Sequence, residues 1–291
     1  MNRKSKGAIP RREYARTGRM LSVIGFGGIV VQDLPQDQAN RVVADAVGQG
    51  VNYFDVSPNY GDAELKLGPA LEPFRDQAFL ACKTSKRTAE AAQAELDESL
   101  RRLRTDHLDL YQLHALTDMA KDVDVAFGAG GAIEVLDRAR KQGRVRHVGF
   151  SAHNEQAALA AMDRYDFDSV LFPINYACWL RGGFGPSVVA AAREKGLATL
   201  ALKALARGKW AKDDPLRPQY RRCWYRPITD PRLAGLALRF TLGQPITAAV
   251  SPGEEAMLSL ALDLCVQLDP LTPAELDELK ALAEEVELIM P

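Results

Sequence analysis

Short apolar runs alternate along the chain with longer stretches in which apolar residues recur at helical spacing. A short apolar run bounded by turn residues predicts a buried strand, and the longer period predicts an amphipathic helix. Ahead of these runs, a turn at residues 16–19 predicts a β-hairpin over residues 11–22. We predict strands at residues 23–28, 51–55, 78–83, 107–114, 145–151, 169–175, 197–203 and 246–250.

A helical pattern follows each predicted strand, and several of these helices have recognisable ends. Thr88 and Asn154 suit N-cap positions, Pro186 suits a first helical turn, and Gly196 suits a helix end. We predict helices at residues 36–50, 63–71, 131–142, 186–196 and 230–242, one each after Thr88, Asn154 and residue 250, and an extra C-terminal helix at 274–289.

Strands that alternate with helices indicate a parallel sheet. Eight such units, with no linker or change of composition between them, favour a closed (β/α)8 TIM barrel that makes residues 1–291 a single domain. A doubly wound sheet is the competing architecture. Its dinucleotide fingerprint is incomplete here, because the run Gly25-Phe-Gly27-Gly28-Ile-Val30 lacks the final glycine.

The amino-acid composition argues against several classes of partner and site. A net charge of −1, from 37 basic and 38 acidic residues, argues against nucleic acid or an anionic membrane as the main partner. The four cysteines form no CxxC pair, so we expect reduced thiols in a cytoplasmic protein, with neither a metal site nor disulfides. We find no apolar segment typical of a signal peptide or a membrane span.

Four polar residues fall at or just after the carboxyl ends of neighbouring predicted strands: Asp55, Tyr60, Lys83 and His114. Barrel closure would gather them at the face where TIM-barrel active sites lie. A tyrosine has an ordinary pKa near about 10, and a nearby ammonium lowers it. A carboxylate would keep that ammonium charged, and a neutral histidine could orient a substrate oxygen. The set suits proton transfer to a carbonyl oxygen, although each residue alone has an ordinary structural explanation.

Longer motifs around these residues resemble the aldo-keto reductase family. They are Phe54-Asp-Val-Ser-Pro-Asn-Tyr-Gly61, Phe79-Leu-Ala-Cys-Lys-Thr84, Asp109-Leu-Tyr-Gln-Leu-His114 and Gly143-Arg-Val-Arg-His-Val-Gly-Phe-Ser151, in that order. The resemblance implies a barrel closed at its bottom by the hairpin, and NAD(P)H-dependent reduction of an aldehyde or ketone without a metal. It implies Tyr60 as general acid, Lys83 and Asp55 tuning it, and His114 orienting the carbonyl.

The resemblance also implies cofactor positions. Ser151 matches a contact to the nicotinamide carboxamide, and Asn175 stands in for a glutamine that the family often has on the sixth strand. Lys203 ends the seventh strand, where the pyrophosphate is expected, and Gly253 can let the backbone approach a phosphate. The full set of expected cofactor contacts is Gly27, Gly28, Ser151, Asn175, Lys203, Ser251 and Gly253.

Cofactor preference depends on the loop after the last strand. The family usually has basic residues there for the 2′-phosphate of NADP, whereas this chain has Glu254 and Glu255. These carboxylates would repel that phosphate unless they point away, or they are first-turn acids favoured by the helix dipole. We expect NADP(H), with NAD(H) possible.

Residues 206–231 form a long basic and aromatic segment on the catalytic side. It is interpreted either as a lid over cofactor and substrate or as a solvated loop anchored by its aromatic residues. Two other functions stay open: a Schiff-base lyase with Lys83 as nucleophile, and a catalytically silent nicotinamide sensor on the same fold. We expect a small carbonyl compound as partner, no nucleic acid or membrane, and a monomer or small homo-oligomer.

Overall fold

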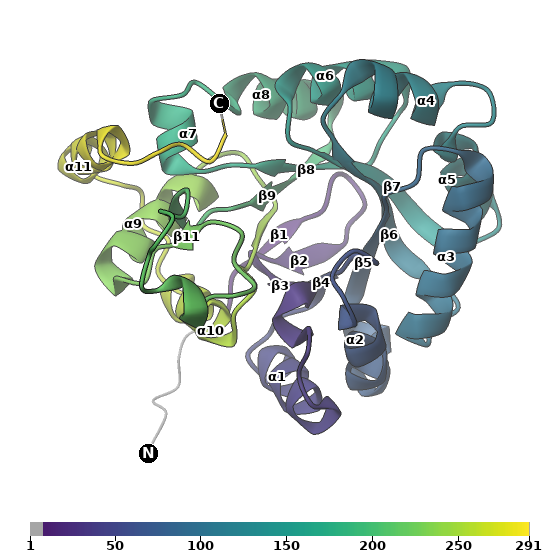
Figure 1. Ribbon diagram of the computed structural model, residues 1–291, viewed down its shortest axis with the longest axis horizontal. Helices are drawn as coiled ribbons and strands as arrows, with labels where there is room; N and C mark the ends of the chain where they lie inside the picture. The colour runs from purple at the N-terminus through teal and green to yellow at the C-terminus, as the bar shows by residue number, and fades with distance from the viewer. Residues whose placement is uncertain (1–7, 291) are drawn as a thin grey trace.

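Eight parallel strands close into a barrel in the computed structural model, which describes residues 8–290 (Figure 1). This excludes the doubly wound sheet and confirms the predicted (β/α)8 barrel. Neighbouring strands follow chain order around the barrel, and the last strand pairs with the first to close it. The strands are β3 (Ile24–Gly27), β4 (Tyr53–Asp55), β5 (Phe79–Thr84), β6 (Leu108–Leu116), β7 (Val145–Ala152), β8 (Ser169–Pro173), β9 (Ala198–Leu202) and β12 (Ala248–Val250).

The main helices surround the barrel and bury their apolar stripes against the outer faces of the strands (Figure 1). In α3, for example, Leu96, Leu100 and Leu103 are buried, whereas the charged residues of the opposite face meet solvent. These helices are α1 (Gln36–Gly48), α2 (Ala63–Leu71), α3 (Ala89–Leu103), α5 (Ala132–Lys141), α6 (Glu155–Arg164), α8 (Pro186–Lys195), α9 (Pro231–Leu242) and α10 (Glu255–Leu264).

Local signals for the helix ends are mostly confirmed. The Asn154 side chain caps α6 by accepting a bond of 2.9 Å from the Ala157 amide. Pro186 occupies the first turn of α8, and Gly196 ends that helix in the left-handed conformation, with a φ of 76°. Thr88 stands at the N-cap of α3, but its side chain makes no capping bond.

The hairpin of β1 (Arg11–Glu13) and β2 (Met20–Ser22) closes the amino-terminal end of the barrel. Tyr14, between its strands, is fully buried and donates a hydrogen bond of 2.9 Å to Ser169 at the start of β8. Its ring also packs on Phe79, at the start of β5, with 4.9 Å between centroids. The predicted hairpin is therefore confirmed, and it leaves the opposite end of the barrel open for a site.

Several segments between strands have more structure than the sequence pattern predicts. After β6, residues 115–131 contain a π-turn, η3 (Met119–Val123), and the short helix α4 (Asp124–Phe127). After β8 comes the short helix α7 (Tyr176–Leu180), which packs on the C-terminal helix α11 (Pro273–Glu284). That last helix ends before the predicted residue 289. The remaining short turns are η1 (Gly28–Val31) and η2 (Glu72–Gln77).

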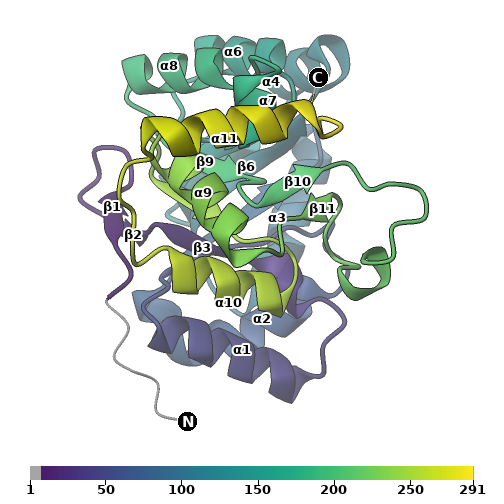
Figure 2. The same ribbon diagram turned by 90° about the vertical axis from the view of Figure 1, so that its left-hand side faces the viewer.

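The long segment 206–231 is anchored at both ends by a small antiparallel sheet. Strands β10 (Ala206–Gly208) and β11 (Arg226–Pro227) pair with each other, and the intervening chain, with the turn η4 (Arg217–Gln219), projects beyond the barrel (Figure 2). We call residues 209–225 the strap. It lies at the end of the barrel opposite the hairpin. Among residues 8–290 no helix is long and apolar enough to cross a membrane.

Candidate active site

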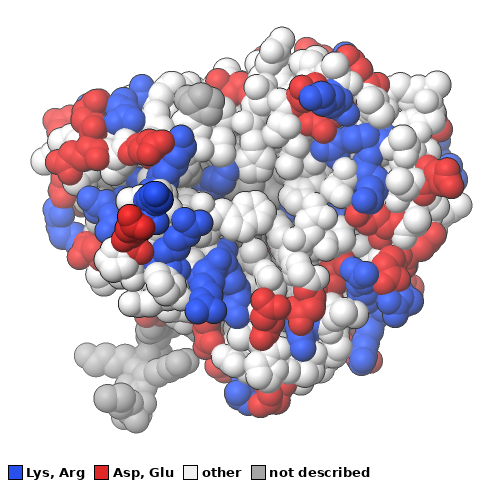
Figure 3. All heavy atoms as spheres, viewed as in Figure 1, with Lys and Arg blue, Asp and Glu red and all other residues white. Residues whose placement is uncertain are grey.

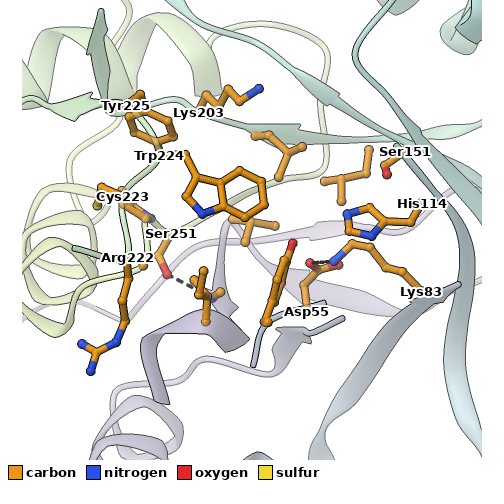
Figure 4. A pocket seen from close by; sticks show the side chains of 18 of the residues that line it. Asp55, Lys83, His114, Ser151, Lys203, Arg222, Cys223, Trp224, Tyr225 and Ser251 are labelled. Atoms are coloured by element: carbon orange, nitrogen blue, oxygen red, sulfur yellow. Dashed lines mark hydrogen bonds and ion pairs between the residues drawn. The ribbon is translucent and has the colours of Figure 1, made fainter. Parts of the chain in front are cut away.

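A pocket opens at the carboxyl ends of the barrel strands (Figure 4). All four residues predicted for proton transfer line it. Asp55 and Lys83 belong to β4 and β5, His114 belongs to β6, and Tyr60 lies on the loop after β4. The complete lining is Gly27, Ile29, Asp55, Tyr60, Lys83, His114, Ser151, His153, Leu171, Leu202, Lys203, Arg222, Cys223, Trp224, Tyr225, Val250, Ser251, Pro252 and Gly253.

An ion pair between Lys83 and Asp55 lies at the floor of the pocket, with each residue only 1% exposed. Burial by itself lowers the pKa of Lys83, but the charges of Asp55 and Tyr60 outweigh it and raise that pKa above its ordinary value. The Asp55 carboxylate also accepts bonds from Gln112 (3.1 Å) and Tyr53 (3.3 Å). Lys83 is thus a fixed, permanently charged ammonium.

Tyr60 lies beside this cation, with the Lys83 ammonium 5.1 Å from the centre of its ring. Burial raises the pKa of Tyr60, the charge of Lys83 lowers it, and the net change is an increase above the ordinary value. The sequence had led us to expect a lowered pKa, so the direction is corrected: loss of solvent around the phenol outweighs the nearby ammonium. Tyr60 therefore keeps its proton at neutral pH and is equipped to act as an acid.

His114 faces Tyr60 edge-on, with 6.1 Å between ring centroids. Burial, followed by the charge of Lys83, lowers the pKa of His114 to about 2, so the imidazole is neutral. Its Nδ1 lies 3.1 Å from the Ser57 hydroxyl, which already accepts a bond from the Asn59 amide. We assign the Ser57 proton to this contact, because it then satisfies Nδ1 and leaves the imidazole proton on Nε2. Nε2–H is then free to donate a hydrogen bond to a ligand.

Comparison with known proteins identifies the family to which this chain belongs. The pattern that defines the Aldo/keto reductase family matches residues 23–223, which is more than half of the chain. The chain belongs to the aldo/keto reductase family. It is therefore an oxidoreductase that acts on a carbonyl compound with a nicotinamide cofactor.

Individual relatives are distant. The chain is 26% identical to L-galactose dehydrogenase of Arabidopsis thaliana over 71% of its length and 69% of that protein. It is 28% identical to 6-dehydroglucose reductase of Novosphingobium aromaticivorans over 71% and 72%. The solved structure of aldo-keto reductase AKR11C1 from Bacillus halodurans (holo form) superposes with a TM-score of 0.74 at 21% identity, covering 97% of this chain and 98% of that one. That likeness supports the barrel fold.

Five of the seven positions predicted to contact cofactor line the pocket of this aldo/keto reductase: Gly27, Ser151, Lys203, Ser251 and Gly253. The Gly27 amide donates a bond of 3.0 Å to the Ser251 hydroxyl, and a Cβ at Gly27 would lie 2.5 Å from the Ser251 carbonyl oxygen. Glycine is therefore required at position 27 by the close approach of β3 and the end of β12.

The other two positions do not line the pocket. A Cβ at Gly28 would lie 2.8 Å from the Cβ of Val56, so packing against the chain after β4 explains this glycine.

Asn175 is buried, and its amide group is used within the protein. Its oxygen caps α7 by accepting bonds from the Ala177 (3.1 Å) and Cys178 (3.3 Å) amides. Its nitrogen donates to the carbonyl oxygens of Lys203 (3.2 Å) and Ala206 (2.7 Å). These bonds occupy both amide protons, so Asn175 has a structural role here, and its contact to the carboxamide stays a prediction.

The strap forms one wall of the pocket of this aldo/keto reductase, which places it where the lid interpretation requires. Arg222, Cys223, Trp224 and Tyr225 all line the pocket (Figure 4). The Trp224 side chain is 67% exposed yet lies edge-on to Tyr60, with 6.2 Å between centroids. Lysines and arginines gather on the side of the opening that the strap covers (Figure 3).

Arg222 ties the strap to the loop after β12. Its guanidinium pairs with Glu254 at 3.0 Å, and its backbone amide donates to the same carboxylate at 2.8 Å. A Cβ at Gly253 would lie 2.5 Å from the Arg222 carbonyl oxygen, so the two segments are in direct contact. Glu254 is thereby neutralised, whereas Glu255 is exposed.

Two polar residues of the site were missed by the sequence analysis. Ser57 lies inside a motif that we recognised, but no local pattern shows that its hydroxyl meets His114. His153 comes directly after β7, the strand that contains Ser151, and its Nδ1 lies 2.9 Å from the Lys203 ammonium. His153 comes two residues after the end of the strand predicted at residues 145–151, and this position was the available signal for it.

We predict that Asn175→Ala lowers the free energy of unfolding by roughly 2 kcal/mol, because a helix cap and two buried hydrogen bonds are lost. Asn175→Asp should cost at least as much, since a carboxylate oxygen would then face two carbonyl oxygens. Urea unfolding measures both, with the exposed Asn40→Ala as control. Weakened cofactor binding at unchanged stability would instead support the carboxamide contact.

We also predict that Ser57→Ala changes the tautomer of His114. In the wild type the proton should reside on Nε2, and without the serine it should be shared between the two ring nitrogens. Nitrogen-15 NMR of labelled histidine reports the tautomer directly, and the His114→Gln spectrum assigns the signal among the four histidines. A wild-type proton on Nδ1 would refute the assignment.

Proposed function

We propose that this aldo/keto reductase reduces an aldehyde or ketone to an alcohol, with Tyr60 as the general acid. The observation that carries the proposal is the buried Lys83–Asp55 pair beside a tyrosine whose pKa is raised. A phenol that keeps its proton can deliver it to an oxygen that becomes negative, and the adjacent ammonium stabilises the phenolate left behind.

His114 orients the substrate in this mechanism. A neutral imidazole with its proton on Nε2 donates a hydrogen bond to the carbonyl oxygen without competing for the transferred proton. A nicotinamide cofactor, when bound in this pocket, would supply the hydride that reduces the carbonyl. Tyr60 then protonates the oxygen, Lys83 holds the phenolate charge, and Asp55 keeps Lys83 in place until Tyr60 regains a proton from solvent.

The pocket offers groups that suit a nicotinamide cofactor. Leu171, Leu202 and Val250 provide an apolar wall for a flat ring, while the hydroxyls of Ser151 and Ser251 supply polar contacts. A second hollow lies beyond the strap, and Arg222 lines both. We propose that the nicotinamide end occupies the catalytic pocket and the adenosine end occupies this outer hollow.

We propose NADP(H) as the preferred cofactor, with NAD(H) as the alternative. Glu254, which seemed from the sequence to oppose a 2′-phosphate, pairs with Arg222, so its charge is largely cancelled. Glu255 also borders the outer hollow but is exposed, where solvent screens it.

The two other functions lose support. A Schiff-base lyase needs an uncharged amine, but Lys83 has a raised pKa and is held by Asp55 and by the Val56 carbonyl oxygen at 3.1 Å. A silent sensor has no feature here in its favour, because the four residues needed for proton transfer lie together. We propose further a single domain over residues 1–291, a monomer or small homo-oligomer, and a cytoplasmic location, which suits the four buried free thiols.

Replacing Tyr60 by Phe should lower kcat for carbonyl reduction by about 10²–10⁴-fold, because the proton donor is lost, and leave cofactor affinity unchanged. In the wild type, reduction should be level through neutral pH and fall only on the alkaline side, where the phenol ionises. Steady-state rates and fluorescence titrations test this, with Tyr165→Phe, outside the pocket, as control. Full activity of the Phe variant would contradict the proposal.

Glu254→Gln should release Arg222 and raise the affinity for NADPH relative to NADH by roughly fivefold, because the guanidinium becomes available to the 2′-phosphate. Glu255→Gln should change the ratio less, since that side chain is exposed. Titrations of both variants with both cofactors at one salt concentration measure the effect. An unchanged ratio in Glu254→Gln would mean that Arg222 does not serve the 2′-phosphate.

A further inference from the structure

We propose that Arg87 is a positioning residue for His114: its guanidinium fixes a bulge in β6 that sets the direction of the imidazole. Arg87 lies on the loop after β5, and it does not line the pocket. The inference deepens the proposed carbonyl reduction and rests on it, because His114 is the group that orients the carbonyl in that mechanism.

The pairing of β6 with β7 is irregular near the carboxyl end of β6. The register between the two strands shifts between Leu113 and Leu116. Over this stretch two residues of β6, His114 and Ala115, stand opposite Ser151 alone, which makes a β-bulge. Bulges occur next to active sites, where they change the direction of a side chain, and this one contains His114 itself.

The backbone of the bulge adopts a strained conformation at Ala115. Its φ of 54° is left-handed, which is unfavourable for a residue with a Cβ, so the surrounding structure must hold it. The bulge also follows the last inward-facing residue of the strand. Leu110 packs inside the barrel, whereas Leu113 and Leu116 pack with the helices. The peptide that joins His114 to Ala115 therefore determines how the imidazole is tilted into the pocket.

Two side chains satisfy the backbone groups of this peptide, one from each side. The Ala115 amide donates to the Ser151 hydroxyl at 2.7 Å. The His114 carbonyl oxygen accepts a bond of 2.6 Å from the Arg87 guanidinium. Because β5 pairs with β6 only as far as Leu113, Arg87 takes the place of a strand neighbour beyond that point. Ser151 and His114 lie on the same side of the pocket (Figure 4).

Arg87 is itself fixed at its backbone and at its side chain. Its carbonyl oxygen accepts a bond of 2.8 Å from the Ala132 amide at the start of α5. Its Nε pairs with Asp122 at 3.0 Å, and the two side chains are only 13% and 17% exposed. Asp122 also accepts from the amides of Thr117 (2.8 Å) and Asp118 (3.0 Å). A charged donor held in this way makes a strong bond and defines the position of the peptide that it contacts.

Arg75 makes the same kind of contact at the other end of β6. Its guanidinium pairs with Asp109 at 3.0 Å and donates to the His107 carbonyl oxygen at 2.9 Å, and its side chain is 16% exposed. Arg87 acts on a residue that lines the pocket, whereas Arg75 acts at the opposite end of the strand. Substitutions of the two arginines therefore separate a positioning role from a loss of stability.

The test uses the full chain with Arg87→Met, which keeps the apolar part of the side chain and removes its donors. Arg75→Met is the matched control. Steady-state reduction of 4-nitrobenzaldehyde by NADPH gives kcat, protein fluorescence gives the Kd of NADPH, and urea unfolding gives the stability. Nitrogen-15 NMR of labelled histidine reports the His114 ring independently of turnover.

Both substitutions should lower the stability by a similar amount. Arg87→Met should also lower kcat by about tenfold, because a displaced imidazole no longer aligns the carbonyl, and leave the Kd of NADPH unchanged. The contact of His114 with Ser57 should weaken, so that the His114 signals change in Arg87→Met and stay as in the wild type in Arg75→Met. Arg87→Lys keeps a cationic donor and should show both changes to a smaller degree, which provides the test if Arg87→Met does not fold.

Equal kcat values and equal His114 signals in Arg87→Met and Arg75→Met would overturn the positioning role. Weaker NADPH binding at unchanged kcat would overturn it too, since the bulge would then serve Ser151. Failure of the proposed function is a separate outcome. If the wild type did not reduce the aldehyde, carbonyl reduction would lose its support, while the NMR comparison would still decide whether Arg87 positions His114.

Discussion

The buried ion pair between Lys83 and Asp55 is the constraint on which the site depends. Removing two charges from water costs several kcal/mol for each ion, and the pair persists only because its remaining bonding capacity is used. Gln112 and Tyr53 donate to the carboxylate, and the ammonium donates to the Val56 carbonyl oxygen. Such a network is expensive for stability alone, and its effect is to hold one positive charge beside Tyr60.

Around that pair, burial and charge act in opposite directions on the pKa values of Lys83 and Tyr60, and in the same direction on that of His114. For Lys83 the neighbouring negative groups prevail and the ammonium persists, whereas for Tyr60 burial prevails and the phenol persists. His114 has both effects acting together, so it stays neutral. The pocket thus holds a protonated phenol, a cation and a neutral imidazole, which are the protonation states that the proposed mechanism of carbonyl reduction requires.

The strap, residues 209–225, contributes further contacts at the pocket. It brings Trp224 edge-on to Tyr60 and places Arg222 between the pocket and the outer hollow. Through Arg222 the strap neutralises Glu254, the residue that had argued most strongly against NADP. Lys203 contrasts with Lys83: both lysines lie at the ends of barrel strands, but only Lys83 has a carboxylate partner among the described residues.

The sequence by itself was enough for the architecture and for the residues at the strand ends. Alternating strand and helix patterns predict the barrel. Asp55, Lys83 and His114 stand at the carboxyl ends of the predicted strands, so barrel geometry alone makes them neighbours. The role of Asn175, the direction of the Tyr60 pKa, the Arg222–Glu254 pair and the Lys203–His153 contact were decided only by the tertiary structure. Each depends on which groups from distant segments meet and on how much water they lose, and no local pattern along the chain carries that information.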